Sequence, residues 1–123
     1  MFIIDAQGNI SLSIGDTASF TVTATGYTFD DDDRALWTLK NLAGDVVFER
    51  VYALNDAELG NGVFQVVLAN GDTDTLPTGN YSWDVRYVIH PYYDERGRIF
   101  DGDQVITPKA AQTLTLLSVV GEV

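Results

Sequence analysis

The sequence predicts an all-β domain in which two sheets pack face to face, and three observations support this prediction. Apolar and polar residues alternate with a period of two along most of the chain, as in strands that bury one face. No segment between these stretches has a convincing helical period, which excludes a βαβ arrangement. Turn-forming residues recur roughly every ten residues, a spacing typical of β-sandwiches.

The first two predicted strands cover residues 10–14 and 18–24. In both, apolar side chains alternate with serine or threonine. Hydroxyl-bearing residues on the solvent face of such a pattern favour a strand over a helix. The dipeptide Gly15-Asp16 ends the first strand, and Gly26 closes the second.

Three further strands are predicted over residues 35–40, 46–51 and 64–68. The first of them alternates around a tryptophan, and the last alternates phenylalanine, valine and leucine with other residues. A turn at 41–45 contains a glycine and separates the first two strands. The stretch 55–62 is rich in turn formers, so we expect it to be a loop.

The last two predicted strands cover residues 81–89 and 113–119, and the dipeptide Asn70-Gly71 makes a turn before them. The first of these strands has the clearest pattern, because its aromatic and branched residues share one face and its polar residues share the other. Between the two strands lies a long segment, 90–103. We therefore expect about seven antiparallel strands with a long hairpin between the last two.

Residues 76–81, Leu-Pro-Thr-Gly-Asn-Tyr, narrow the fold further. In immunoglobulin-like sandwiches a tyrosine near the start of the sixth strand bonds back to upstream backbone, and Pro77 and Gly79 supply turn chemistry before Tyr81. The sequence thus predicts an immunoglobulin-like β-sandwich. The residues expected in its single core share one phase of the alternation: Phe20, Val22, Trp37, Phe64, Val66, Tyr81, Trp83 and Val85.

The composition excludes some classes of partner for this domain. The chain has 123 residues, which we expect to form one domain over 1–123, and it has no cysteine and a net charge of −11. Such a surface repels nucleic acid and anionic membranes, so neither is an expected partner. No signal peptide and no apolar run of about 20 residues is present, so we expect synthesis in the cytoplasm.

Neither a metal site nor a catalytic site is predicted, and no cofactor is expected. The run 30–33 is four aspartates, but consecutive carboxylates in an extended loop do not converge as calcium requires, so we expect a solvated acidic loop. His90 is the only histidine, which makes a zinc site improbable without cysteine. No Gly-x-Ser-x-Gly elbow accompanies it, and we expect it where a strand ends beside Pro91.

The long hairpin carries the candidate partner-binding residues, Tyr92, Tyr93, Arg96, Arg98 and Phe100. Aromatic and arginine side chains on an exposed hairpin are typical interface anchors. The alternative is that the hairpin folds back over its own sandwich, where its aromatic residues pack, and merely lengthens two strands.

Several of the few basic residues of this acidic chain lie in the hairpin or just before it. Arg86, Arg96 and Arg98 are three of its seven basic residues. We expect them to form a local positive cluster that complements an acidic patch of a neighbouring copy.

Two stretches of the sequence resemble small virion proteins of tailed bacteriophages and prophages. One is residues 10–18, Ile-Ser-Leu-Ser-Ile-Gly-Asp-Thr-Ala, and the other is residues 72–86, with Asp-Thr-Asp-Thr-Leu-Pro-Thr-Gly-Asn-Tyr followed by Ser-Trp-Asp-Val-Arg. Residues 121–123, Gly-Glu-Val, are compatible with the ending of that group. The group is similar to the amino-terminal immunoglobulin-like domain of upper baseplate proteins.

This resemblance implies a non-enzymatic structural or assembly role in a virion. It implies contacts with other virion proteins or with copies of the same chain, and residence in the host bacterial cytoplasm before the virion. The chain departs from the group in replacing a short hairpin with the segment 90–103, and it lacks the fibre and receptor-binding parts of baseplate proteins. The rival interpretation is a carbohydrate- or cell-surface-binding module that stacks Tyr92 and Tyr93 on sugar rings.

Overall fold

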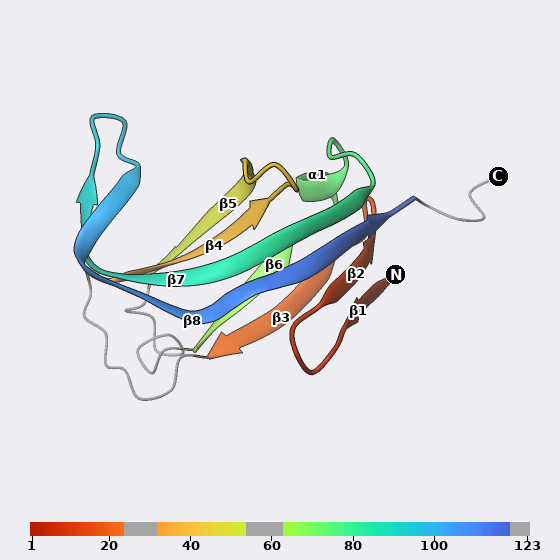
Figure 1. Ribbon diagram of the computed structural model, residues 1–123, viewed down its shortest axis with the longest axis horizontal. Helices are drawn as coiled ribbons and strands as arrows, with labels where there is room; N and C mark the ends of the chain where they lie inside the picture. The colour runs from red at the N-terminus through yellow and green to blue at the C-terminus, as the bar shows by residue number, and fades with distance from the viewer. Residues whose placement is uncertain (24–31, 54–62, 119–123) are drawn as a thin grey trace.

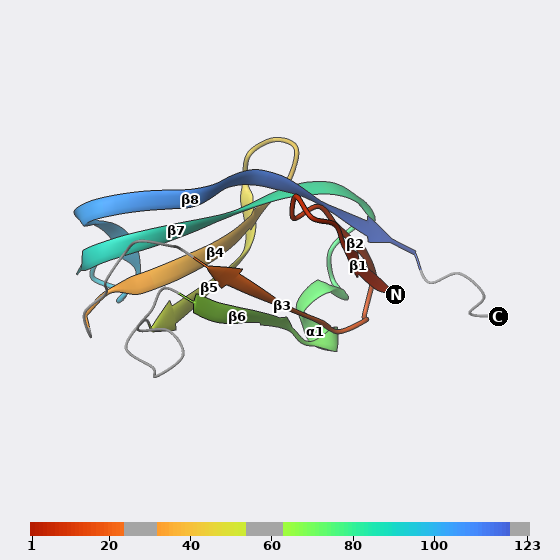
Figure 2. The same cartoon turned by 90° about the horizontal axis from the view of Figure 1, so that it is seen from below.

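The protein folds as a β-sandwich of two unequal sheets (Figures 1 and 2), as a computed structural model describes it for residues 1–23, 32–53 and 63–118. The larger sheet has the strand order β1-β2-β8-β7-β4-β5, and β3 pairs with β6 in the smaller one. The elements are β1 (Phe2–Ile4), β2 (Ile10–Ser13), β3 (Ala18–Thr23), β4 (Arg34–Lys40), β5 (Val46–Ala53), β6 (Val63–Leu68), α1 (Asn70–Thr73), β7 (Gly79–Tyr93) and β8 (Ile99–Leu117).

The strand arrangement is that of an immunoglobulin-like domain, which confirms the predicted fold class. Strands β4, β7 and β8 lie side by side in one sheet, and β3 and β6 face them from the other. They correspond in order to the C, F and G strands and to the B and E strands of such domains. Trp37, on the strand that corresponds to C, is fully buried.

One strand was not predicted, and two details of the prediction are wrong. The described residues contain eight strands, because β1 adds an unpredicted antiparallel edge to β2. The sandwich is not wholly antiparallel, since β2 pairs in parallel with β8, Ile10 opposite Leu114. The turn predicted at Asn70-Gly71 is the start of the single helical turn α1.

Some predictions fall outside the described residues. The predicted end of the second strand at Ala24, the loop 55–62, the reach of the last strand to Val119 and the ending 121–123 all lie there. So do Asp30 and Asp31 of the aspartate run.

Aromatic rings from both sheets form the centre of one core. Phe20 on β3 lies 5.6 Å from Trp83 on β7 and 6.2 Å from Trp37 on β4, measured between ring centroids. The predicted core is confirmed for every described side chain, and the side chain of Phe64 is outside the described part. Large aromatic burial of this kind is a dominant favourable contribution to stability.

Two side chains, Tyr81 and Arg50, make polar contacts that stabilise the sandwich. The Tyr81 hydroxyl donates to the Pro77 carbonyl at 2.6 Å, which confirms the predicted tyrosine corner. On the other side, Arg50 on β5 donates to the Val67 carbonyl at 2.6 Å and pairs with Asp72 at 3.1 Å. Arg50 therefore links the edge of the larger sheet to β6 and α1.

Candidate interaction site on the distal hairpin

The distal hairpin, residues 91–101, has a turn fixed by one carboxylate. Asp94 Oδ1 accepts the backbone N–H groups of Arg96 and Arg98, both at 2.9 Å. Gly97 supplies the positive φ of 79° that the turn needs. The hairpin is thus a built element with a defined tip, which projects at the left of Figure 1.

The hairpin leaves the line of β7 and β8 at a bend (Figure 1). His90 has a φ of 48°, and a Cβ on Gly102 would lie 2.5 Å from Val88 Cγ1 and 2.7 Å from the Ile89 carbonyl oxygen. Only glycine fits at that contact. The expectation that a strand ends at His90 is wrong, because β7 continues through the bend to Tyr93.

The three aromatic residues predicted for this site are exposed. The exposed fractions are 45% for Tyr92, 50% for Tyr93 and 66% for Phe100. The rings of Tyr92 and Phe100 lie 6.4 Å apart between centroids. The structure therefore brings two of the predicted anchors together as one exposed aromatic surface.

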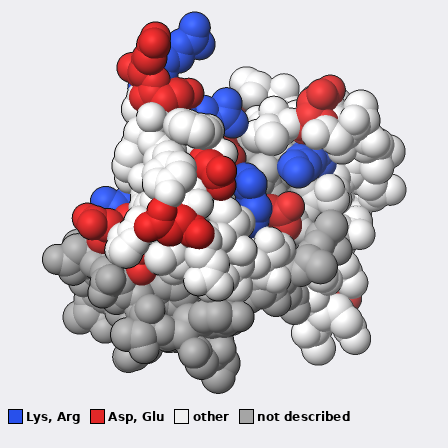
Figure 3. All heavy atoms as spheres, turned by 60° about the vertical axis from the view of Figure 1, so that its left-hand side comes forward, with Lys and Arg blue, Asp and Glu red and all other residues white. Residues whose placement is uncertain are grey.

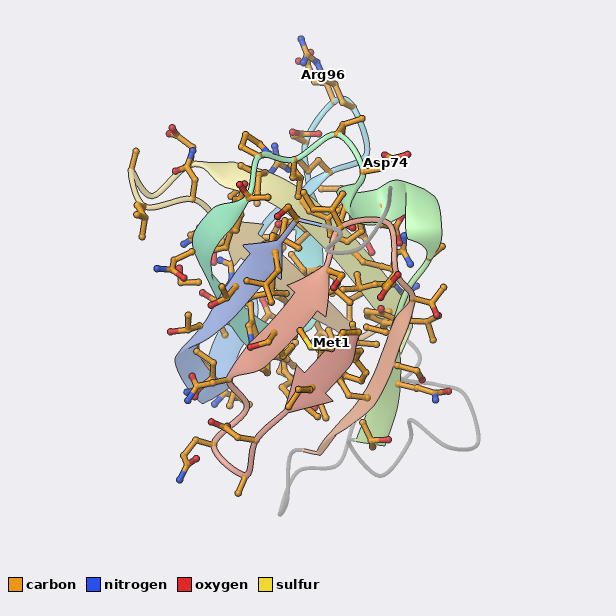
Figure 4. The ribbon with its side chains drawn as sticks, turned by 90° about the vertical axis from the view of Figure 1, so that its right-hand side faces the viewer. Met1, Asp74 and Arg96 are labelled. Atoms are coloured by element: carbon orange, nitrogen blue, oxygen red, sulfur yellow. The ribbon has the colours of Figure 1, made fainter. Side chains whose placement is uncertain are left out.

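The two arginines of the hairpin point in different directions. Arg96 is at the outer tip and points away from the sandwich (Figure 4). Arg98 turns toward β5, and its Nη2 lies 3.7 Å from Glu49 Oε1. The alternative is confirmed in one respect, because the hairpin lengthens two strands: β7 reaches Tyr93 and β8 begins at Ile99. Its aromatic residues, however, are not buried on the sandwich.

The expectation of a positive cluster on the hairpin is wrong. Segment 90–103 contains four carboxylates, Asp94, Glu95, Asp101 and Asp103, beside its two arginines. Red and blue atoms accordingly lie together on the projecting tip in Figure 3. The hairpin therefore presents mixed charge around an aromatic surface.

A polar cluster at the base of the hairpin was missed by sequence reasoning. Asp103 accepts a hydrogen bond from the Tyr92 hydroxyl through Oδ1, and its Oδ2 lies 3.1 Å from His90 Nδ1. The hydrogen bond to Asp103 raises the pKa of Tyr92. The same bond, followed by the one with His90, lowers the pKa of Asp103.

One aspartate of the predicted solvated run also belongs to this base. Asp33 is 1% exposed, and its Oδ1 accepts the His90 backbone N–H at 3.1 Å. Arg34 Nη1 donates to the Asp33 carbonyl at 2.8 Å. The prediction of a solvated loop is wrong for Asp33, which ties the start of β4 to the bend in β7, whereas Asp32 is exposed as expected.

A shallow pocket of about 280 Å³ opens beside this cluster. It is lined by Asp32, Arg34, His90, Pro91, Tyr92 and Tyr93. Asp32 lies just before β4 and Arg34 begins it, whereas the other four residues lie on β7 beyond the core. The pocket thus joins two neighbouring strands at the point where the hairpin bends.

The described part of the chain contains no group of three or more histidine, cysteine, aspartate and glutamate side chains arranged to hold a metal ion. Within the same residues, no helix has the length and apolar character needed to cross a membrane.

No protein-family model matches this chain, and no curated protein is similar enough to count as a match.

Proposed function

We propose that this chain is a non-enzymatic structural module that acts through protein–protein contacts, with the distal hairpin as its contact surface. The observation that carries the proposal is the exposure of Tyr92, Tyr93 and Phe100 on a hairpin whose turn is fixed by hydrogen bonds. Aromatic residues contribute a large share of the energy at interfaces. A hairpin that is already ordered also loses little conformational entropy on binding.

Contacts with its own sandwich leave this surface available. The bond between Tyr92 and Asp103 and the ion pair between Arg98 and Glu49 fix the base and one side of the hairpin. Neither contact covers the Phe100 ring, which is 66% exposed. Burial of such an exposed apolar ring against a partner surface gives favourable free energy of binding.

We further propose that the module belongs to the virion of a tailed bacteriophage or prophage. The support is the ordered motif set in residues 10–18 and 72–86, together with the immunoglobulin-like fold that the resemblance implies. Its partners would then be other virion proteins or copies of itself, in a homo-oligomer. Assembly would take place in the host bacterial cytoplasm, followed by residence in the particle.

The test compares a double variant of the hairpin with a matched control. Phe100→Ala combined with Arg96→Ala removes an exposed ring and the tip charge and leaves the hydrogen bonds of the turn in place. Leu42→Ala removes an apolar side chain that is even more exposed, at 84%, on the turn between β4 and β5. We expect the double variant to lose self-association in sedimentation velocity, or incorporation into purified particles, while Leu42→Ala retains both.

A double variant with unchanged association and unchanged incorporation would contradict the hairpin as contact surface. Absence of the wild-type chain from purified particles of a phage that encodes it, measured by mass spectrometry, would contradict the virion assignment.

A further inference from the structure

The pocket at the base of the distal hairpin has walls that are held in place. Asp33 fixes the His90 backbone at 3.1 Å, and Asp103 contacts both the His90 ring and the Tyr92 hydroxyl. Two of the lining side chains are therefore positioned by groups that lie outside the lining itself. A pocket with restrained walls binds a ligand at lower entropic cost than a loop that must first become ordered.

The lining of the pocket balances its charges. It contains one carboxylate, Asp32, one guanidinium, Arg34, and one imidazole, His90, together with two phenol rings and a proline. A polyanionic ligand would meet Asp32 and a chain of net charge −11, so phosphates and nucleic acids are disfavoured. A cationic ligand would meet Arg34. The charges therefore favour a neutral ligand.

The same groups match a ring that bears hydroxyls. Hydroxyl groups both donate and accept hydrogen bonds. Among the lining groups, Asp32 accepts, Arg34 donates and the Tyr93 hydroxyl does both, whereas the Tyr92 hydroxyl donates to Asp103 and can still accept. Tyr93 is half exposed beside these groups and offers a ring face on which the C–H face of a saccharide can pack. The volume of about 280 Å³ lies at the low end of small-molecule sites, which suits a single ring.

We propose that this pocket is a saccharide subsite that takes one neutral pyranose ring, with Tyr93 as the stacking residue and Asp32 and Arg34 as hydroxyl partners. Tyr92 and Tyr93 belong both to the pocket and to the proposed contact surface, but the two proposals can be tested separately, because Phe100 and Arg96 do not line the pocket. Any saccharide of this class can occupy it, whether free or at the end of a longer glycan.

The test is an NMR titration of the ¹⁵N-labelled full chain with glucose, galactose, N-acetylglucosamine and N-acetylgalactosamine, one at a time. We expect at least one sugar to shift the amide signals of residues 32–34, His90, Tyr92 and Tyr93 in a saturable manner. Tyr93→Ala should weaken that binding about fivefold or more, because it removes the stacking ring, whereas Tyr93→Phe should keep it within about twofold.

Phe100→Ala is the matched control, since it removes an exposed ring from the same hairpin outside the pocket. We expect it to leave sugar binding unchanged. No saturable shift with any of the four sugars would overturn the proposal, as would equal weakening by Tyr93→Ala and Phe100→Ala. Because Phe100→Ala combined with Arg96→Ala tests protein contact, the two proposals fail separately.

Discussion

Tyr81→Phe tests the tyrosine corner through the loss of a single oxygen atom. The hydroxyl of Tyr81 donates to the Pro77 carbonyl at 2.6 Å, and the side chain is 6% exposed. Phenylalanine keeps the ring and its packing, so the change removes one hydrogen bond. Because Pro77 is exposed, its freed carbonyl can bond to water. The expected loss is therefore about 1 kcal/mol, near the mean for a single bond.

That loss is measurable in two ways. With a urea m-value of about 2 kcal/mol/M, the midpoint of unfolding should fall by about 0.5 M. In a thermal melt of a chain of this size, the midpoint should fall by about 4 °C.

Tyr93→Phe provides the matched control, since that side chain is half exposed and has no role in the corner. We expect its free energy of unfolding to stay within about 0.5 kcal/mol of wild type, as is usual for surface changes. Equal midpoints for Tyr81→Phe and wild type would refute the corner as a stabilising contact.

The remaining predictions concern the bend, the sheet-closing arginine and the base of the hairpin. Gly102→Ala should destabilise the domain by more than about 2 kcal/mol in urea melts, because its Cβ would lie 2.5 Å from Val88 Cγ1; a midpoint equal to wild type would contradict the bend. Arg50→Ala should cost about 1–2 kcal/mol through its lost bonds to β6 and α1, and an unchanged melt would be evidence against that link. The phenol of Tyr92 should titrate above pH 10 in ultraviolet absorbance, since its pKa is raised by Asp103, and Asp103→Asn should move the midpoint down. Because the folded pKa of Asp103 is lowered, its contribution to stability is present above its ordinary pKa of 3.8 and is lost as pH falls through the folded pKa. The pKa of Tyr92 is raised, so its contribution to stability is present below pH 10 and is lost as pH rises through the folded pKa.

The parts of the fold that depend on local pattern could be predicted from the sequence. Alternation assigns Trp37 and Trp83 to the core, because side-chain direction in a strand follows residue parity. The spacing of Pro77 and Gly79 before Tyr81 predicts the corner because the hydrogen bond is local and spans only four residues. These features need no knowledge of distant partners.

The features that were missed depend on pairing between distant residues. The parallel contact of β2 with β8 joins Ile10 to Leu114, and no local pattern distinguishes it from an antiparallel pair. The burial of Asp33 arises from His90, which is 57 positions away in sequence. The alternation of apolar and polar residues shows neither which distant residues pair nor whether two strands run parallel or antiparallel.

The polar base of the hairpin was missed because of a register shift. The pairing changes between Tyr92 and Tyr93, where Tyr93 lies opposite Ile99 but Tyr92 lies opposite Asp101. The extra residue is Phe100, and beyond it the pairing is displaced by one position. A regular hairpin counted outward from the turn would not bring Asp103 to His90, so the sequence predicts the exposed aromatic residues but not the cluster beneath them.

The central claim is that the distal hairpin is the surface through which this domain binds its partners. Amide hydrogen exchange, compared between the isolated chain and the chain in its assembled particle, tests it most directly. The account predicts that protection rises in residues 91–101 and is unchanged in the core strands. Protection gained only at β1 or β5, or at no part of the chain, would contradict it.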